Sequence, residues 1–159
     1  MDEQRVPALK NPQNIEEFLV YRLFRLVGVA LRGTDDMYKR ELGISRREWR
    51  ILAYLERTPD ASLKTLAADS RVDTVVASRL VSTMVERGLL MKQRDPSNKR
   101  MISLRLTDLG QQVHGKALSL GTKYNRRLAS CLSDDEARAL ESLFLKLERQ
   151  AEVVDLTHE

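Results

Sequence analysis

The chain has 159 residues, of which 42% are hydrophobic, and its formal net charge at pH 7 is +4. This length and composition suit one compact domain, or a small domain attached to an oligomerisation scaffold. A single cysteine excludes an intrachain disulfide and any metal site built from several cysteines. The start of the sequence does not resemble a signal peptide, and no apolar run approaches bilayer length, so we expect a cytoplasmic protein.

The N-terminal segment, residues 1–42, is predicted to contain a long helix after a loose start. Asn14 and Glu17 have the spacing of a capping box, which would begin the helix at that point. A wide apolar stripe follows at helical spacing, formed by Ile15, Phe18, Leu19, Leu23, Leu26, Val27 and Ala30. Because a terminal helix in so small a domain has little else to cover, the stripe favours dimerisation.

A second helix is predicted to begin at Ser45, with Glu48 as its capping-box partner. Ile44 and Trp49 flank this start at the spacing of a hydrophobic staple, which fixes the direction in which the chain enters a helix. These residues open a central segment that we place at residues 43–106.

The part of this segment from Ala61 to Leu106 carries the most informative pattern of the chain. Ser62 can cap a short helix, and Asp73 can cap a second helix after a tight turn. The buried face of the second helix would consist of Val76, Leu80, Val81 and Met84. Small hydroxyls, a valine and an arginine then face outward, namely Thr74, Val75, Ser78, Arg79 and Ser82. Such a face suits an element that enters the major groove of DNA.

The residues on this outer face can be interpreted either as DNA contacts or as ordinary surface residues. Arg79 could bond a guanine edge or a phosphate, and Val75 could meet a thymine methyl beside the hydroxyls of Thr74 and Ser78. Alternatively, all four are ordinary solvated residues of a helix surface. We expect DNA contact by Arg79 and base contact by at least one of the other three.

A basic hairpin is predicted directly after this helix. Gly88 suits the position that follows a helix end, residues 89–94 can form a strand, and residues 95–100 are rich in turn formers. Ile102, Leu104 and Leu106 then alternate with polar residues, as in a half-buried strand. Cations at the tip (Lys99 and Arg100) and in the earlier turn (Arg71) are candidate DNA ligands, although either tip residue could pair with Asp95. The pattern therefore predicts a winged helix-turn-helix domain.

The C-terminal segment, residues 107–159, is predicted to form two helices. Thr107 can cap the first, and Ser133 with Glu136 repeats the capping-box spacing before the second. Apolar residues on the last helix recur at steps of three and four, the seam spacing of packed helices, and the central ones are Leu140, Phe144, Leu147 and Ala151. The seam could pack within one subunit, but we favour an interface between two. The predicted fold is mainly α, with long terminal dimerisation helices around a small β-hairpin wing.

The distribution of charge agrees with this arrangement. Residues 71–100 contain seven lysines and arginines against three carboxylates, whereas residues 134–159 contain three against eight. The positive charge therefore lies on the predicted DNA-binding helix and hairpin, and the acidic C-terminal segment is poorly suited to contact DNA phosphates.

Catalytic patterns are not apparent in the sequence. His158 lies near the C-terminal end, and His114 has no Asp, Ser or Cys at a recognisable triad or metal-site spacing. No Gly-rich phosphate loop occurs, and helix capping accounts for the acidic triplet at residues 134–136. We expect no catalytic site, no metal site and no cofactor.

Several of these motifs together resemble the MarR family of bacterial winged helix-turn-helix regulators. The resemblance is carried by four stretches, Val72 to Val81, Val85 to Leu90, Arg94 to Arg100, and Leu106-Thr107-Asp108-Leu109-Gly110. It implies a symmetric homodimer that binds a pseudo-palindromic operator on double-stranded DNA, usually as a repressor released by a small molecule. Members of the family commonly carry Asp where this chain has Asn98, so the carboxylate of the usual carboxylate–arginine brace in the wing is missing at this position.

The resemblance also implies an effector site near the start of the second helix, where Tyr38, Arg46 and Trp49 lie, with Met37 and Arg50 nearby. Aromatic rings beside an arginine would suit an aromatic acid or its thioester. Alternatively, Trp49 is a core staple and Arg46 a solvated cation. The sequence is also compatible with a DNA-binding or architectural protein without an effector, and with a redox-sensing regulator that uses Cys131, although an inert, half-buried thiol fits Cys131 better.

Overall fold

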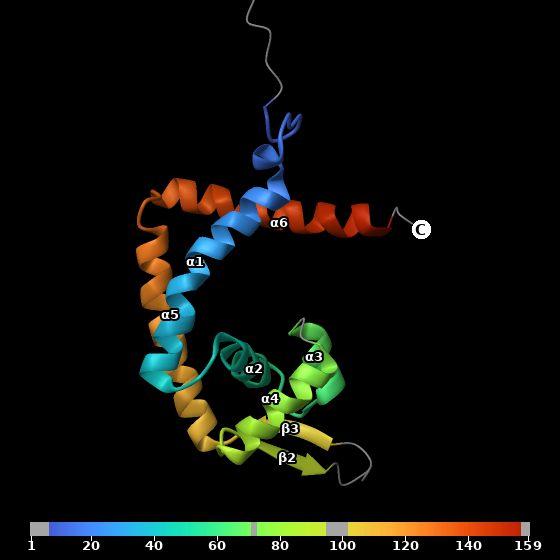
Figure 1. The fold of residues 1–159 in the computed structure, drawn as a ribbon, viewed down its shortest axis with the longest axis vertical. Helices are drawn as coiled ribbons and strands as arrows, with labels where there is room; N and C mark the ends of the chain where they lie inside the picture. Colours follow the sequence, from blue (N-terminus) through green and yellow to red (C-terminus); the bar gives the residue numbers. More distant parts are fainter. Residues whose placement is uncertain (1–6, 71–72, 95–101, 157–159) are drawn as a thin grey trace, which may run out of the picture. The chain divides into compact units, whose positions relative to one another are not determined.

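The computed structural model describes residues 7–70, 73–94 and 102–156 (Figure 1). The described part is mainly helical, with one three-stranded antiparallel sheet. Its elements in chain order are the 3-10 turn η1 (Ile15–Glu17), α1 (Leu19–Leu42), α2 (Arg46–Arg57), β1 (Ala61–Ser62), α3 (Leu63–Asp69), α4 (Thr74–Glu86), β2 (Leu90–Arg94), β3 (Ile102–Leu106), α5 (Asp108–Ala129) and α6 (Asp134–Leu156).

The chain divides into two compact units, Met1–Gly121 and Thr122–Glu159, and the boundary falls within α5. The first unit contains the winged helix-turn-helix with α1 and most of α5, and the second contains α6. The three-part division at residues 42 and 106 stays a prediction.

The start of the first helix differs from the expected capping box. Asn14 makes no capping hydrogen bond, and its side-chain amide instead donates to Glu17 Oε1 at 3.0 Å. The other carboxylate oxygen of Glu17 accepts from the backbone N–H of Gln13 at 2.7 Å. With the carboxylate engaged before the turn, the chain makes only η1, passes through an extended Phe18, and begins α1 at Leu19.

The remaining helix starts agree with the local sequence signals. Ser62 Oγ accepts from Thr65 N–H, and the Asp73 carboxylate accepts from the N–H groups of Val75 and Val76. These bonds satisfy backbone donors that have no partner within the first turn of a helix. Short polar side chains therefore cap the N-termini of both α3 and α4.

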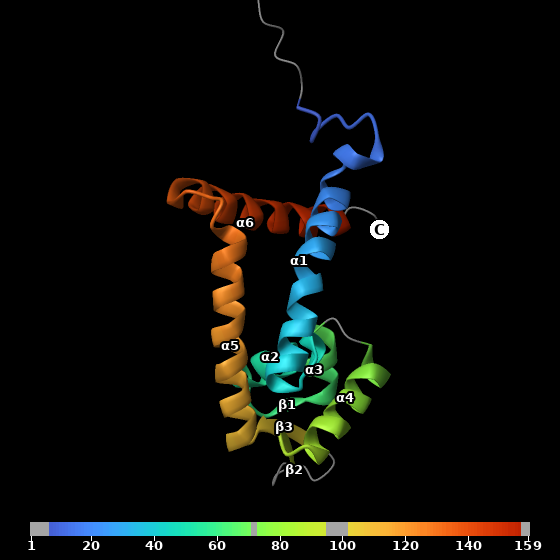
Figure 2. The ribbon, with the colours of Figure 1, turned by 60° about the vertical axis from the view of Figure 1, so that its left-hand side comes forward.

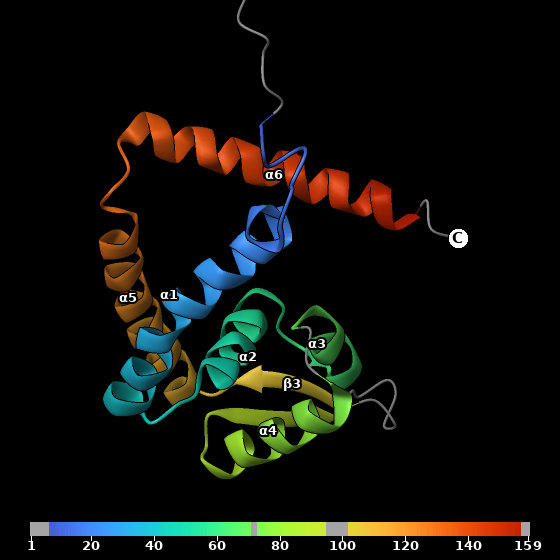
Figure 3. The ribbon, with the colours of Figure 1, turned by 45° about the horizontal axis from the view of Figure 1, so that its top comes forward.

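The core of the first unit lies between the helices and the sheet, where α2, α3 and α4 gather around the strands (Figures 2 and 3). The strand order is β1-β3-β2, and β3 pairs with both neighbours in antiparallel register, Ala61 opposite Leu104 and Lys92 opposite Leu104. The fully buried large side chains are Ile44, Ile51, Leu52, Leu55, Leu66, Met84, Leu90 and Leu104. Burial of this apolar surface holds α4 against β2 and β3.

The junction between the wing and α5 is unusually close. Thr107 caps α5 by accepting from the N–H of Gly110 at 3.0 Å, and its own N–H donates to the carbonyl of Leu89 at 3.2 Å. A Cβ atom at Gly110 would lie 2.1 Å from that same carbonyl oxygen, far inside van der Waals contact. Only glycine therefore allows α5 to begin at this distance from the first residues of the wing.

Helix α6, in the second unit, begins with a confirmed capping box. Ser133 N–H donates to Glu136 Oε2 at 2.8 Å, and Glu136 N–H donates to Ser133 Oγ at 3.3 Å. The hydrogen bonds from the Ser133 backbone and hydroxyl hold the pKa of Glu136 below its usual range, because they stabilise the charged carboxylate. The helix start predicted before residue 134 is thus correct.

Candidate nucleic-acid interface

Helix α4 presents the outward face that the sequence predicts. Thr74, Val75, Ser78 and Arg79 are exposed, and 59% of the Val75 surface is accessible although valine is apolar. The opposite face is buried through Ala77, Val81 and Met84. Ser82 was expected to face outward as well, but it is half-buried.

Three of the candidate DNA ligands, Arg71, Lys99 and Arg100, lie outside the described residues, as does Asn98. The strands that lead to the hairpin tip are described, and Met91 and Lys92 are exposed on β2. Ile102, expected on the inward face of the strand, is instead 48% exposed at the start of β3. Leu104 and Leu106 follow the predicted inward pattern.

A carboxylate–arginine pair braces the base of the wing. The Asp60 carboxylate accepts hydrogen bonds from Nε and Nη2 of Arg105 and from Ser103 Oγ, and the Asp60 N–H donates to the Leu104 carbonyl. Asp60 has a φ of 65°, a left-handed conformation that aspartate tolerates better than most residues. The pair therefore ties the loop before β1 to the outer side of β3.

The hydrogen bond and charge of Arg105 hold the pKa of the Asp60 carboxyl below its usual range. Because this pKa is lower in the folded than in the unfolded protein, the Asp60–Arg105 pair stabilises the fold fully at pH values above the pKa of the unfolded carboxyl. This stabilisation is lost as pH falls through the lowered value. This pair was not predicted, because the only local signals were an aspartate in a Pro-containing loop and an outward arginine on the strand.

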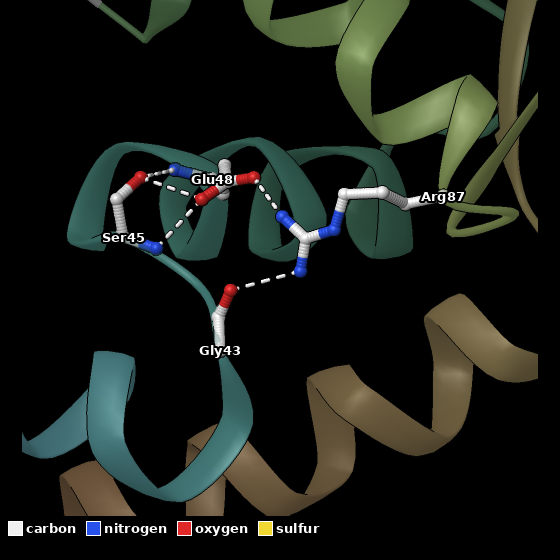
Figure 4. A network of polar contacts seen from close by, with 4 residues as sticks. All are labelled: Gly43, Ser45, Glu48 and Arg87. Atoms are coloured by element: carbon white, nitrogen blue, oxygen red, sulfur yellow. Dashed lines mark hydrogen bonds and ion pairs between the residues drawn. The ribbon is translucent and has the colours of Figure 1, made fainter.

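A second polar network joins the end of α4 to the junction of α1 and α2 (Figure 4). Arg87, the residue that follows α4, donates from Nη1 to Glu48 Oε1 at 2.6 Å and from Nη2 to the carbonyl of Gly43 at 2.8 Å. The other oxygen of Glu48 accepts from Ser45 N–H at 2.6 Å and from Ser45 Oγ at 2.8 Å. The predicted capping box is therefore confirmed, and its carboxylate has an additional partner. We call Gly43, Ser45, Glu48 and Arg87 the Arg87 clamp.

Two of the three residues predicted to contact an effector, Tyr38 and Trp49, lie against each other. The rings of Tyr38 and Trp49 have centroids 5.9 Å apart, and the Trp49 ring stacks on His114 at 5.1 Å with an interplanar angle of 27°. Tyr38 is only 4% exposed and belongs to the core, and this burial raises its pKa. Trp49 and His114 are half-buried. His114, which the sequence brought to attention only as a possible catalytic residue, is thus an unpredicted member of this aromatic group.

Arg46 lies at the start of α2 with an incompletely satisfied guanidinium group. Its Nη1 atom is 3.7 Å from Asp35 Oδ2, an ion-pair distance that is too long for a hydrogen bond. The same atom is buried and has no hydrogen-bond acceptor among the described residues. A buried donor without an acceptor is costly, so this nitrogen would gain from an anionic or carbonyl oxygen brought by a ligand.

The apolar stripes of the terminal helices are exposed in this chain. Leu140, Phe144 and Leu147 on α6 retain 40%, 39% and 37% of their surface, and Ala151 is exposed as well. On and just before α1, the exposed members of the predicted stripe are Ile15, Phe18, Leu26 and Val27, at 49–58%. Exposed apolar residues arranged in a row are typical of surfaces that meet another protein.

The described residues contain no group of three or more His, Cys, Asp or Glu side chains that could hold a metal ion. Cys131, predicted to be half-buried, is instead a free and exposed cysteine between α5 and α6. Among the described helices, none combines the length and the apolar composition that crossing a bilayer would require.

Known proteins resemble this chain in sequence and in fold. A family model for the MarR family matches residues 42–101. The HTH-type transcriptional regulator BilQ of Clostridium symbiosum is 32% identical over 110 residues, which cover 69% of this chain and 76% of that protein.

Solved structures agree with the fold. A MarR/EmrR family transcriptional regulator from Acinetobacter sp. ADP1 superposes with a TM-score of 0.77 at 22% identity, covering 87% of this chain and 98% of that one. The PcaV transcriptional regulator from Streptomyces coelicolor, solved in complex with its natural ligand, superposes with a TM-score of 0.65 at 24% identity, covering 92% and 98%.

Proposed function

Because this chain belongs to the MarR family of winged helix-turn-helix, DNA-binding transcriptional regulators, we propose that it binds a pseudo-palindromic operator as a homodimer. We propose further that it acts in the cytoplasm as a repressor and that a small molecule releases it from DNA. The observation that carries the proposal is the outer face of α4.

This face offers chemistry that distinguishes one base pair from another. Arginine forms paired hydrogen bonds with guanine, hydroxyls bond several base edges, and an exposed valine can contact the methyl group of thymine. The Asp73 cap begins α4 just before Thr74, so its first turn carries two of the four exposed candidates, Thr74 and Val75. Arg71, Lys99 and Arg100 would then bind the phosphates on either side, which positions the helix without reading sequence.

Replacing Arg79 with alanine should weaken binding to the preferred duplex by roughly 1–3 kcal/mol and should flatten base preference at one position of the site. The preferred duplex is selected from a random-sequence pool by the wild-type protein, and affinities are measured by fluorescence anisotropy. Arg57→Ala, which removes an exposed arginine at the end of α2, is the matched control and should change little. Unchanged affinity and preference in Arg79→Ala would contradict this orientation of α4.

The homodimer is supported by the exposed apolar rows on α1 and α6. Each row is too regular to be a scatter of surface residues, and a second copy of the chain supplies an identical apolar row for it to meet. A two-fold dimer whose two copies of α4 lie about one turn of DNA apart, roughly 34 Å, would match a pseudo-palindromic site.

The effector is proposed to be a small aromatic carboxylate or aryl thioester bound beside Arg46, Trp49 and His114. The half-buried rings offer stacking surface, and Arg46 Nη1 offers an unsatisfied donor for an oxygen atom. PcaV, which has the same fold, was solved with its natural ligand. Tyr38 supports the Trp49 ring from the core rather than offering an open surface. The alternative is a regulator without an effector, in which these rings serve only the core.

A panel of aromatic acids and their thioesters should identify the effector through the fluorescence of Trp49, the only tryptophan of the chain. An active compound should change Trp49 emission and lower affinity for the selected duplex by about 1–3 kcal/mol, a typical coupling energy. Arg46→Ala should weaken the fluorescence response and leave DNA binding without ligand nearly intact, whereas Arg47→Ala on the same helix should do neither. If no compound alters emission or DNA affinity, the regulator without an effector becomes the better description.

A further inference from the structure

We propose that the Arg87 clamp positions α4 for sequence reading and transmits DNA contact to the first turn of α2, where Trp49 lies. The inference rests on the proposed operator binding and assigns a role to residues that face neither DNA nor the proposed effector. Arg87 and Glu48 are positioning residues in this account.

Arg87 is suited to this role by its place and its geometry. It follows α4 directly, eight residues beyond Arg79, a span of roughly 12 Å along a rigid helix. Its planar guanidinium group donates to the Glu48 carboxylate and to the Gly43 carbonyl with two different nitrogens. Because the donors are fixed relative to each other, the pair of bonds defines a direction as well as a distance.

The acceptor side of the clamp is held equally firmly. Glu48 is 7% exposed, and the oxygen that does not bind Arg87 accepts two hydrogen bonds from Ser45. Gly43 ends α1 with a left-handed φ of 64°, and its carbonyl is the second acceptor. The clamp therefore joins the end of α4 to the residue that follows α1 and to the first turn of α2, as Figure 4 shows.

Apolar packing alone would hold α4 less specifically. Val81 and Met84 bury the inner face of the helix, but the hydrophobic effect has no preferred direction and tolerates small rotations and shifts. The charge-assisted bonds of Arg87 are directional and partly shielded from water. They define where the C-terminal end of α4 lies and, through the rigid helix, how Arg79 is presented.

The hydrogen bonds of Arg87 would also transmit a movement of α4 to α2. Glu48 and Trp49 are consecutive residues of α2, and Arg46 precedes them in the same turn. When DNA binding shifts α4, Arg87 either displaces Glu48 or loses its hydrogen bond to the Glu48 carboxylate. Either response changes the surroundings of the Trp49 ring, which contacts the rings of Tyr38 and His114.

The test compares three variants of the full chain. Arg87→Met removes both donors and keeps much of the length of the side chain. Glu48→Gln keeps an acceptor for the capping box but removes the charge that pairs with Arg87. Arg47→Met is the control, because it removes an exposed arginine from the same turn of α2.

Each protein is titrated with the duplex selected by the wild-type chain and with a scrambled duplex, while Trp49 emission is recorded. We expect Arg87→Met to reduce the ratio of the two affinities by at least about fivefold, the lower end of typical coupling. The change in Trp49 emission that the selected duplex causes in the wild-type protein should disappear. Glu48→Gln should shift both readouts in the same direction, and Arg47→Met should match the wild type.

A clamp that only stabilises the fold would lower the free energy of unfolding but leave these two readouts unchanged, and that result would overturn the inference. An emission from wild-type Trp49 that DNA does not alter would overturn it as well. If Arg87→Met does not fold, Glu48→Gln decides by the same criteria. A wild-type chain that enriches no sequence would instead refute the proposed operator binding, so the two failures are distinguishable.

Discussion

Replacing Leu140 and Leu147 together with aspartate should convert the proposed dimer into monomers or insoluble chains. Both leucines lie in the exposed apolar row of α6, and an aspartate at either site would bury an unpaired carboxylate in the seam. Monomers would bind each half-site independently. Affinity for the complete operator should therefore fall by about a hundredfold or more, the scale of the gain that linking two binding modules provides.

Sedimentation velocity measures the oligomeric state, and circular dichroism verifies that the helices persist. The matched control is Ser142→Asp with Arg149→Asp, which has the same spacing of seven residues on the opposite face of α6 and should remain dimeric. A Leu140→Asp, Leu147→Asp protein that is soluble, folded and still dimeric would show that the two copies meet elsewhere.

Raising the salt concentration from about 50 to 200 mM should weaken binding to the selected duplex by roughly 150-fold if four phosphates are neutralised, given a slope of about −0.9 per phosphate. The cations available for this lie in the proposed DNA-binding segment, residues 71–100, where lysines and arginines outnumber carboxylates by seven to three. Counterions released from DNA supply the driving force, and added salt reduces it.

Titrations at four salt concentrations give the slope directly. A scrambled duplex should show a similar slope at lower affinity, because phosphate contacts do not depend on sequence. A change of less than about tenfold over this range, which corresponds to fewer than two phosphates, would contradict the proposed wing and turn contacts.

The parts of the fold that the sequence predicts well are those governed by neighbouring residues. The starts of α2, α4, α5 and α6 depend on hydrogen bonds across two or three residues, made by Ser45, Asp73, Thr107 and Ser133. The N-terminal prediction fails for an equally local reason. The Glu17 carboxylate is engaged by Gln13 and Asn14, so the spacing of a capping box does not produce one.

The two ion pairs that support the candidate site could not be predicted, because the two residues of each pair are far apart in the sequence. Glu48 and Arg87 are separated by 39 residues, and Asp60 and Arg105 by 45. The chain has 27 lysines and arginines and 23 aspartates and glutamates, so charge alone offers too many pairings. His114 and Trp49 meet for a similar reason: the packing of α5 on α2 aligns them, and no periodicity within either helix indicates it.

The close junction at Gly110 bears on attempts to build chimeric regulators. Since the Leu89 carbonyl leaves no space for a side chain at residue 110, the wing and α5 form a single rigid joint. The Thr107 bonds to Gly88 and Leu89 belong to the same joint. A reading domain transplanted onto foreign dimerisation helices would thus need its fusion point beyond Gly110, so that residues 88–110 are transferred together. A fusion at the predicted boundary of residue 106 would separate the two halves of this joint.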